Sequence, residues 1–195
     1  MKFSRRITGM QASPIRKLVP YANEAKAKGK KVYHLNIGQP DIVTPAGFFE
    51  AIRNFREDVL AYSTSAGSNE LIDAIRKYYQ GYGIEYGREH IIITNGGSEA
   101  LMFAMIALCD PGDEILVPEP FYTNYNGFGQ AVNVVIRPIT TKAECGFHLP
   151  AAGEIEKLVS PATRAILISN PGNPTGVVYT DQEIMMLAEI AKKHD

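Results

Sequence analysis

An apolar run that ends in two glycines and a serine is the first segment here with the chemistry of a binding site. Residues 91–94 are followed by Asn95-Gly96-Gly97-Ser98, where a pattern of helical spacing begins. Glycine allows close approach of a backbone to a ligand, and a helix start presents unpaired N–H groups and a positive dipole end. With the Ser98 hydroxyl, this segment could bind a phosphate group. A capped helix after a tight turn is the alternative interpretation.

The loop Asn170-Pro171-Gly172-Asn173-Pro174-Thr175-Gly176 is the second candidate. Each asparagine precedes a proline, which disfavours the helical conformation at that asparagine. Two prolines and two glycines predict a stiff loop after the apolar run 165–169, and open α/β sheets bind ligands at the carboxyl ends of their strands. An asparagine held there would offer a fixed amide donor, whereas a rigid turn without a ligand is the alternative.

Short apolar runs alternate with helical patterns along the second half of the chain, which indicates a parallel sheet covered by helices. The runs that we expect to be strands are residues 91–94, 114–117, 132–136 and 165–169. The expected helices are 13–29, one capped by Thr44-Pro45, 68–79, 98–108 and 184–193, the last opened by a capping box from Thr180 to Glu183. We predict a mostly helical segment over residues 1–85 and an α/β domain over residues 86–195.

Composition argues against several functional classes. The formal net charge is −1, and the basic residues are scattered, so neither nucleic acid nor an anionic membrane is an expected partner. Cys109 and Cys145 have no metal-ligand spacing, and a disulfide framework is not expected. No signal-peptide pattern and no apolar run of about 20 residues is present. We therefore expect a cytoplasmic protein.

Four segments in register resemble the class I/II aminotransferases, which are pyridoxal 5'-phosphate (PLP) enzymes of fold type I. The segments are Asn36-Ile-Gly-Gln-Pro-Asp41, Ala61-Tyr62 with Gly67, Pro118-Glu-Pro-Phe-Tyr-Thr-Asn-Tyr125 and Ser169-Asn-Pro-Gly-Asn-Pro-Thr-Gly176. The resemblance extends over essentially all 195 residues. It implies a three-layer α/β large domain, incomplete and with its first four strands only. It also implies a helical amino-terminal arm that contributes to a small domain.

The resemblance also implies roles for four residues around the cofactor. Gly97 and Ser98 resemble the pair that binds the PLP phosphate through backbone and hydroxyl groups. Tyr122 resembles the aromatic residue that stacks on the pyridine ring. Asn173 resembles the asparagine that donates a hydrogen bond to the phenolic oxygen of the cofactor and lies beside the substrate. A packing role is the alternative for Tyr122.

Two further residues of the amino-terminal half match family positions. Gly38 resembles the residue whose backbone lies against the substrate carboxylate, and a role in the turn alone is the alternative. Tyr62 resembles a tyrosine that reaches the cofactor phosphate of the neighbouring subunit, with a surface aromatic as the alternative. If Tyr62 has this role, a complete active site requires both subunits of a homodimer.

In the family, the Schiff-base lysine, the acidic partner of the pyridinium and the arginine that binds the substrate carboxylate all lie beyond the asparagine loop. We therefore expect this chain to be a truncated part of an enzyme, with no catalytic lysine and no activity by itself. The strand at 91–94 would also lack its neighbour in the sheet. Such a chain would be marginally stable, rearranged or completed by another chain.

The function that the resemblance implies is transfer of an amino group between an amino acid and a 2-oxo acid by a cytoplasmic homodimer. Aspartate is one candidate donor. Another fold type I chemistry, such as that of a carbon–sulfur lyase or an acyltransferase, is the first alternative. A PLP-sensing or interaction domain is the second.

Overall fold

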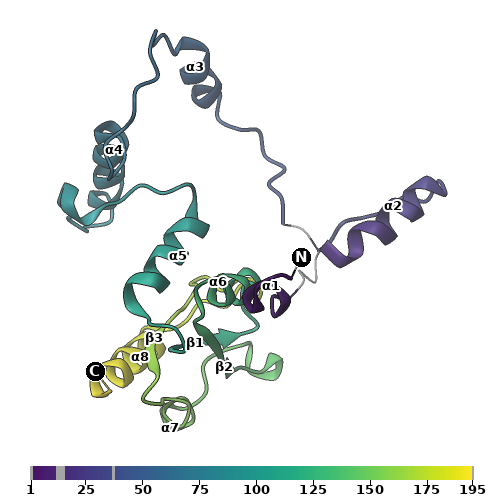
Figure 1. Ribbon diagram of the computed structural model, residues 1–195, viewed down its shortest axis with the longest axis vertical. Coiled ribbons are helices and arrows are strands. Elements are labelled where there is room, and N and C mark those ends of the chain that lie inside the picture. The colour runs from purple at the N-terminus through teal and green to yellow at the C-terminus, as the bar shows by residue number, and fades with distance from the viewer. Residues whose placement is uncertain (1, 12–15, 37, 195) are drawn as a thin grey trace. The chain divides into compact units, whose positions relative to one another are not determined.

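A computed structural model describes residues 2–11, 16–36 and 38–194. The chain divides into two compact units, which we call the sheet unit (Met1–Lys30 and Ser98–Asp195) and the helical unit (Lys31–Gly97). Figure 1 labels the elements of both. The expected helix start at Ser13-Pro14 lies outside the described residues. The assignment of residues 1–85 and 86–195 to two domains stays a prediction.

The sheet has three parallel strands in the order β2-β1-β3. They are β1 (Glu114–Glu119), β2 (Val135–Thr140) and β3 (Thr163–Ile166). β1 is the central strand, and its four middle residues are all buried, as the apolar run in the sequence predicted. Parallel strands with both faces covered require such continuous apolar runs.

The prediction of a strand at residues 91–94 is wrong for this structure. The segment pairs with no strand among the described residues, and its Ile93 N–H donates to the carbonyl of Ala66 (2.8 Å). Apolar and β-branched residues favour an extended backbone. A strand in a sheet also needs a neighbouring strand with which it exchanges backbone hydrogen bonds along its length. The described sheet therefore has three strands rather than the four expected.

β2 begins later than the strand predicted at residues 132–136, because a helix that was not predicted precedes it. α6 (Asn124–Val132) occupies the chain up to the point where the strand was expected. It ends at Asn133, which has a left-handed backbone (φ 60°). A residue in this conformation ends a helix and redirects the chain, so β2 cannot begin before Val134.

Two apolar clusters make the sheet unit a three-layer structure. Ile115 and Val117 point to one face of β1, where they pack with Met105 of α5 (Gly97–Leu108) and Tyr125 of α6. Leu116 points to the other face, against residues of α7 (Ala152–Glu156) and α8 (Asp181–Lys193). This alternation follows from the two-residue period of a strand. In Figure 1, α6 and α7 lie on opposite sides of the strands.

The remaining helices of the sheet unit are short or exposed. They are α1 (Arg5–Thr8), η1 (Arg16–Leu18), α2 (Val19–Ala27) and η3 (Ala143–Cys145).

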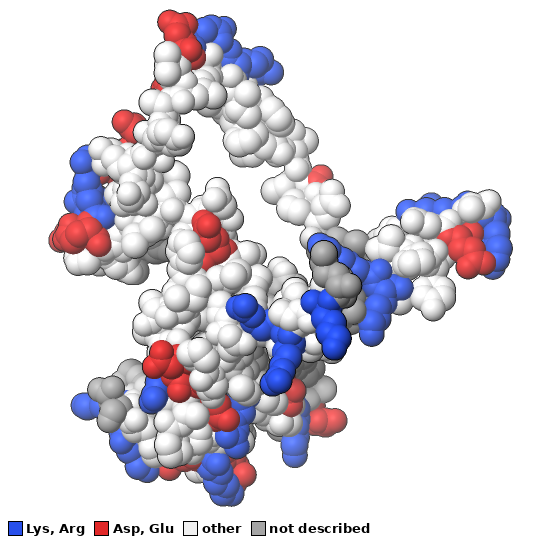
Figure 2. Space-filling view, in the orientation of Figure 1, with Lys and Arg blue, Asp and Glu red and all other residues white. Residues whose placement is uncertain are grey.

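The predicted capping box of α8 is confirmed: the Thr180 hydroxyl accepts from Glu183 N–H (3.2 Å), and the Glu183 carboxylate accepts from Thr180 N–H (2.8 Å). Three large apolar side chains of α5 are exposed, namely Phe103, Ile106 and Leu108, and the surface over this helix in Figure 2 carries little charge.

The helical unit contains α3 (Ala46–Asn54), α4 (Asn69–Gln80) and η2 (Arg88–His90). The helix predicted at residues 68–79 is confirmed as α4, and Ser68 caps it by accepting from Leu71 N–H (3.2 Å). The predicted cap of α3 at Thr44 is wrong, because the capping residue is Pro45 and no side chain bonds to the helix start. No described helix is long and apolar enough to cross a membrane.

Candidate functional site

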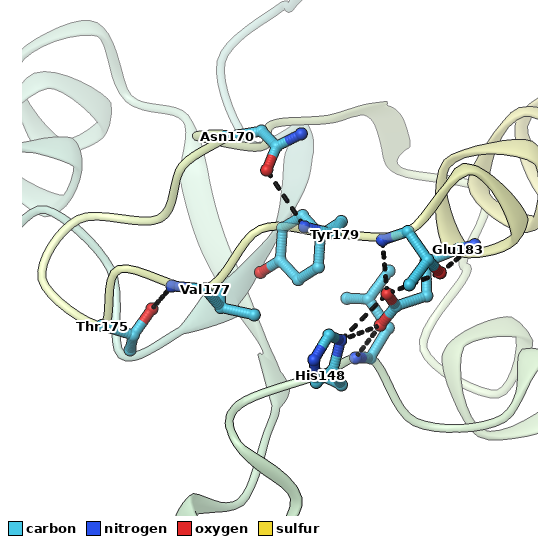
Figure 3. A network of polar contacts seen from close by, with 8 residues as sticks. His148, Asn170, Thr175, Val177, Tyr179 and Glu183 are labelled. Atoms are coloured by element: carbon cyan, nitrogen blue, oxygen red, sulfur yellow. Dashed lines mark hydrogen bonds and ion pairs between the residues drawn. The ribbon is translucent and has the colours of Figure 1, made fainter.

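The loop after β3 is fixed by hydrogen bonds to its own chain (Figure 3). The amide oxygen of Asn170 accepts from Tyr179 N–H (3.0 Å), which closes the base of the loop. Within it, Gly172 N–H donates to the carbonyl of Val177 (2.8 Å), and Gly176 N–H donates to Gly172 (2.7 Å). The peptide bonds before Pro171 and Pro174 are cis. The stiff loop predicted from its prolines and glycines is thus present.

Glycine is required at two positions of this loop. A Cβ on Gly172 would lie 2.7 Å from the Thr175 hydroxyl and 2.9 Å from Cγ1 of Val177. Gly176 has a φ of +75°, a backbone conformation that L side chains rarely adopt. The loop can therefore fold back on itself only with these two glycines in place.

Asn173 differs from Asn170 in what its side chain does. Asn170 uses its amide oxygen to hold the loop, whereas no described residue forms a hydrogen bond with the Asn173 amide. Asn173 is exposed on the loop, and the loop around it is fixed. An amide held in this way, with its donors and its acceptor available, can bind a polar ligand with little further loss of conformational entropy.

The segment after β1 carries Tyr122, the second predicted contact. The Tyr122 ring is half-buried, and its hydroxyl accepts from the side-chain amide of Asn124 (2.7 Å). The edge-to-face contact with Tyr125 has a centroid distance of 5.5 Å and an interplanar angle of 86°. Tyr122 also packs against the cluster of Ile115 and Val117. Its orientation is therefore set by two neighbours in its own segment and by the sheet.

The sheet brings the two segments together. β1 and β3 are parallel neighbours, so the chain after each one emerges at the same edge of the sheet. A narrow crevice there is lined by Phe121 and Tyr125 from the first segment and by Ser169, Asn173 and Thr175 from the second. The sequence could predict each segment separately, and the strand pairing explains their proximity.

The glycine-serine segment lies at the start of α5. Gly96 has a φ of +78°, and a Cβ on Gly97 would meet no atom within 4 Å. Ser98 is exposed, and one turn further Leu101 packs against the same cluster as Tyr122. The segment thus combines an open backbone with the N-terminus of a twelve-residue helix. Phosphate binding at Gly97 and Ser98 stays a prediction.

Gly38 and Tyr62 belong to the helical unit, and both are exposed. Their roles at the site stay predictions. Gly67, which belongs to the same sequence motif as Tyr62, has a local explanation instead. A Cβ there would lie 2.3 Å from Cγ1 of Ile93, so this glycine allows the segment at 91–94 to pack closely.

Sequence reasoning missed two side-chain contacts near the loop. Tyr125 is buried in the apolar cluster on one face of β1, and it lines the crevice together with Ser169. His148 is the second, because its Nδ1 lies 3.0 Å from the Glu183 carboxylate (Figure 3). Both pairs are far apart along the chain, so no local pattern could reveal them.

Glu183 has the most strongly shifted carboxyl group beside the loop. Burial raises its pKa, but hydrogen bonds from the N–H groups of Thr180 and Leu149 and from His148 lower the pKa to about 2. These bonds measure 2.8 Å, 2.7 Å and 3.0 Å. These bonds hold the segment before α7 against the start of α8.

Charged side chains gather at the opposite end of the strands. Arg164 pairs with Asp113 (3.0 Å), and Arg137 pairs with Glu114 (3.0 Å), all at or near the amino ends of the strands. At the carboxyl ends, Tyr122, Ser169 and Asn173 are polar but uncharged. No group of His, Cys, Asp and Glu among the described residues could hold a metal ion. Hydroxyl and amide groups at this edge can both donate and accept hydrogen bonds.

Comparison with known proteins agrees with this geometry. A probable aspartate/prephenate aminotransferase of Thermus aquaticus is 34% identical over 98% of this chain and 50% of the relative. An aspartate aminotransferase structure from Thermotoga maritima has a TM-score of 0.91 at 33% identity, over 99% of this chain and 52% of that one. An alanine aminotransferase structure from Pyrococcus furiosus has a TM-score of 0.88 at 32% identity, over 99% and 50%.

The chain spans about half the length of the relatives it matches. The family model for aminotransferase class I and II matches residues 30–195, which include the glycine-serine segment, Tyr122 and the Asn173 loop. Residues 1–29 lie before the matched range, whereas the structural likeness covers nearly the whole chain. This chain belongs to the class I and II aminotransferase family.

Proposed function

We propose that this chain supplies part of the cofactor site of a PLP-dependent aminotransferase, which moves an amino group between an amino acid and a 2-oxo acid. The observation that carries the proposal is the position of Asn173. Its amide is free of described partners on a loop that its own hydrogen bonds hold in place. The strand pairing puts this loop beside the segment that carries Tyr122.

The residues present fit PLP in three respects. Tyr122 presents an aromatic ring whose edge contact with Tyr125 and whose bond from Asn124 fix its orientation, as stacking on a pyridine ring requires. Asn173 offers an amide donor for the phenolic oxygen. The start of α5, with its open glycines and Ser98, offers N–H groups and a hydroxyl for a phosphate.

When bound, PLP would supply an electron sink that weakens the bonds to the α-carbon of an amino acid. The task of this chain is to bind and orient it. Asn173 would donate to a charged oxygen, a bond worth about 1.5–3 kcal/mol. Tyr122 would exclude water from one face of the ring, and the helix start would hold the phosphate end.

The amino donor is the finer part of the proposal. Relatives at similar identity carry the names of aspartate/prephenate and alanine aminotransferases. We propose aspartate as the first donor to test, with Gly38 against the substrate carboxylate and Tyr62 reaching a second subunit of a cytoplasmic homodimer. These aminotransferase names favour transamination over the carbon–sulfur lyase alternative. Inactivity of the chain by itself stays a prediction.

The test measures binding of deoxypyridoxine 5'-phosphate to the chain by titration calorimetry. This analogue lacks the aldehyde of PLP, so it cannot react with surface lysines and reports only non-covalent binding at the proposed cofactor site. We expect saturable binding with one site per chain. Asn173→Ala should weaken it at least about tenfold, because it loses a hydrogen bond to a charged oxygen.

Asn54→Ala is the matched control. Asn54 is an exposed asparagine at the end of α3, with no part in the proposed site, and its replacement should leave the affinity unchanged. Equal affinity of the wild-type chain and Asn173→Ala would remove the assignment of the loop. An absence of saturable binding by the wild-type chain would contradict the proposal that this chain supplies part of a cofactor site.

A further inference from the structure

The Asn173 loop is closed at its base by a side chain. Its outgoing limb (residues 167–172) and its returning limb (residues 177–180) are joined near the tip by a backbone bond from Gly172 N–H to the carbonyl of Val177 (2.8 Å). At the base, the acceptor for Tyr179 N–H is Oδ1 of Asn170 (3.0 Å, Figure 3). In an ordinary antiparallel pair, a backbone carbonyl would accept this bond.

The N–H group of Tyr179 depends on this acceptor. Tyr179 is 8% exposed, and no described group other than Asn170 Oδ1 accepts from its N–H. A buried N–H without a partner carries a free-energy cost. The Asn170 side chain is itself exposed, and its amide nitrogen has no partner among the described residues. The loop therefore uses only the oxygen of this asparagine.

The two limbs are held to the rest of the sheet unit in different ways. Thr180 N–H, next to Tyr179 in the returning limb, donates to the Glu183 carboxylate (2.8 Å), which attaches this limb to α8. The last bond from the outgoing limb to the sheet is that of Leu167 N–H to β1 (2.8 Å). Residues 168–171 form no backbone–backbone bond with the described residues. The Asn170 side chain thus attaches the outgoing limb to a limb that α8 fixes.

We propose that Asn170 is a positioning residue, which ties the outgoing limb of the loop to Tyr179 and so holds the Asn173 amide at the crevice. This inference rests on the proposed function. Without the bond, the loop would be closed only near its tip, and Asn173 would move relative to the Tyr122 ring. A ligand would then have to order the loop as it binds, which weakens its affinity.

Coupling between Asn170 and Asn173 tests the proposal. Asn170→Ala should weaken the binding of deoxypyridoxine 5'-phosphate about fivefold in titration calorimetry, the contribution of one hydrogen bond. In a chain that already carries Asn173→Ala, the same replacement should have little further effect, because Asn170 acts through the Asn173 amide. Wild-type affinity in Asn170→Ala, or equal losses in both backgrounds, would overturn the proposal.

Asn170→Asp is the conservative variant that should restore binding. Aspartate keeps an acceptor oxygen at the same place and replaces only the amide nitrogen that the loop does not use. Because its charge repels an anionic ligand, all affinities are compared at about 0.5 M salt, where that repulsion is screened. Asn170→Asp should then recover most of the affinity that Asn170→Ala loses. If it binds as weakly as Asn170→Ala, the acceptor oxygen is not what positions Asn173, and the inference fails.

Hydrogen exchange reports the closure of the loop without any ligand. The amides of Gly172 and Gly176, which donate within the loop, and that of Tyr179 should exchange faster in Asn170→Ala. The amide of Leu116 in the central strand should keep its wild-type rate, which shows that the variant remains folded. Unchanged rates in the loop of Asn170→Ala would contradict the proposal.

Thr163→Val is the matched control for stability. Thr163 lies at the opposite end of β3, and its hydroxyl accepts from Ser160 N–H (2.9 Å). Its replacement removes a bond of the same kind, from a backbone N–H to a side-chain oxygen, and should lower the urea midpoint without changing the affinity. If affinity falls as far in Thr163→Val as in Asn170→Ala, lost stability alone explains the effect and the inference is wrong.

Failure of the inference and failure of the proposed function give different results. If the wild-type chain and Asn170→Ala bind the analogue equally well, the chain retains the cofactor site and Asn170 loses only its positioning role. If the wild-type chain binds no analogue, the cofactor proposal fails and hydrogen exchange alone decides the role of Asn170. Faster exchange in the loop of Asn170→Ala then supports the closure of the loop by this side chain, and unchanged exchange overturns it.

Discussion

The Glu183 carboxylate connects two segments that are distant in the sequence. It accepts from Thr180 N–H and Thr180 Oγ1 at the start of α8, and from Leu149 N–H before α7. Because its pKa is about 2 in the folded chain, well below the ordinary value of 4.5, the charged form stabilises the fold. The contribution is present in full above about pH 4.5 and disappears as the pH falls towards 2.

We therefore predict that Glu183→Gln lowers the free energy of unfolding at neutral pH by on the order of 3 kcal/mol, at 1.36 kcal/mol per pKa unit. The side chain is 14% exposed, so solvent screens the interaction little. The variant should also show a weaker loss of stability between pH 4.5 and pH 2 than the wild-type chain. Urea unfolding at a series of pH values measures both effects.

Glu154→Gln is the control for this prediction. Glu154 pairs with Lys157, but its side chain is 62% exposed, and such surface pairs contribute little. Its stability should follow the wild-type curve across the acid range. An equally steep acid dependence in Glu183→Gln would show that other carboxyl groups govern acid unfolding.

The junction of α6 and β2 depends on close backbone approach at one glycine. A Cβ on Gly129 would lie 2.7 Å from the carbonyl oxygen of Val134 and 3.0 Å from Cγ1 of Ile136. The same turn is closed by the bond from Val134 N–H to the carbonyl of Gly129 (2.8 Å). A side chain there would push the helix away from the strand.

We predict that Gly129→Ala destabilises the chain by about 1–3 kcal/mol through overpacking. Gly127, two residues earlier in the same helix, is the matched control because a Cβ there meets no atom within 4 Å. Gly127→Ala should be neutral or stabilise by about 0.5–1 kcal/mol, since alanine is the better helix former. Urea midpoints that fall equally for both variants would contradict the overpacking argument.

The same helix shows where sequence reasoning ends at the scale of elements. α6 contains two glycines and two asparagines, which are weak helix formers, so no local pattern predicted it. Glycine is needed at position 129 because of a contact with the following strand, and the helix propensities of single residues do not report such tertiary contacts. By contrast, the capping box at Thr180 was predicted correctly, because a cap depends only on residues within one turn.

The strand at residues 91–94 and the site illustrate the same distinction. The run has the composition of a strand, but pairing depends on a partner that the local sequence does not specify. The Asn173 loop was predictable because its prolines and glycines restrict the backbone directly. The proximity of the Asn173 loop to the segment that carries Tyr122 was not, because only strand pairing brings the two segments together.

Burial is distributed unevenly over the whole chain. Among the described residues, the helical unit buries one apolar side chain, Ile72, whereas the sheet unit contains two clusters that cover both faces of β1. On α3, Phe48, Phe49 and Ile52 are all more than 45% exposed. Local stability follows the density of buried contacts, so the two units should not open with the same free energy.

Hydrogen exchange at single residues tests this division. We predict the slowest amide exchange at Leu116 and Val117 in the central strand, and much faster exchange throughout α4. Ile139→Ala removes a side chain that is 0% exposed and should cost about 2–5 kcal/mol. That loss should accelerate exchange in β1 and β2 and leave α4 unchanged, because Ile139 packs only within the cluster of Leu116, Ile155 and α8. An equal acceleration in α4 would instead mean that the chain unfolds as one cooperative unit, whose stability depends on the sheet core alone.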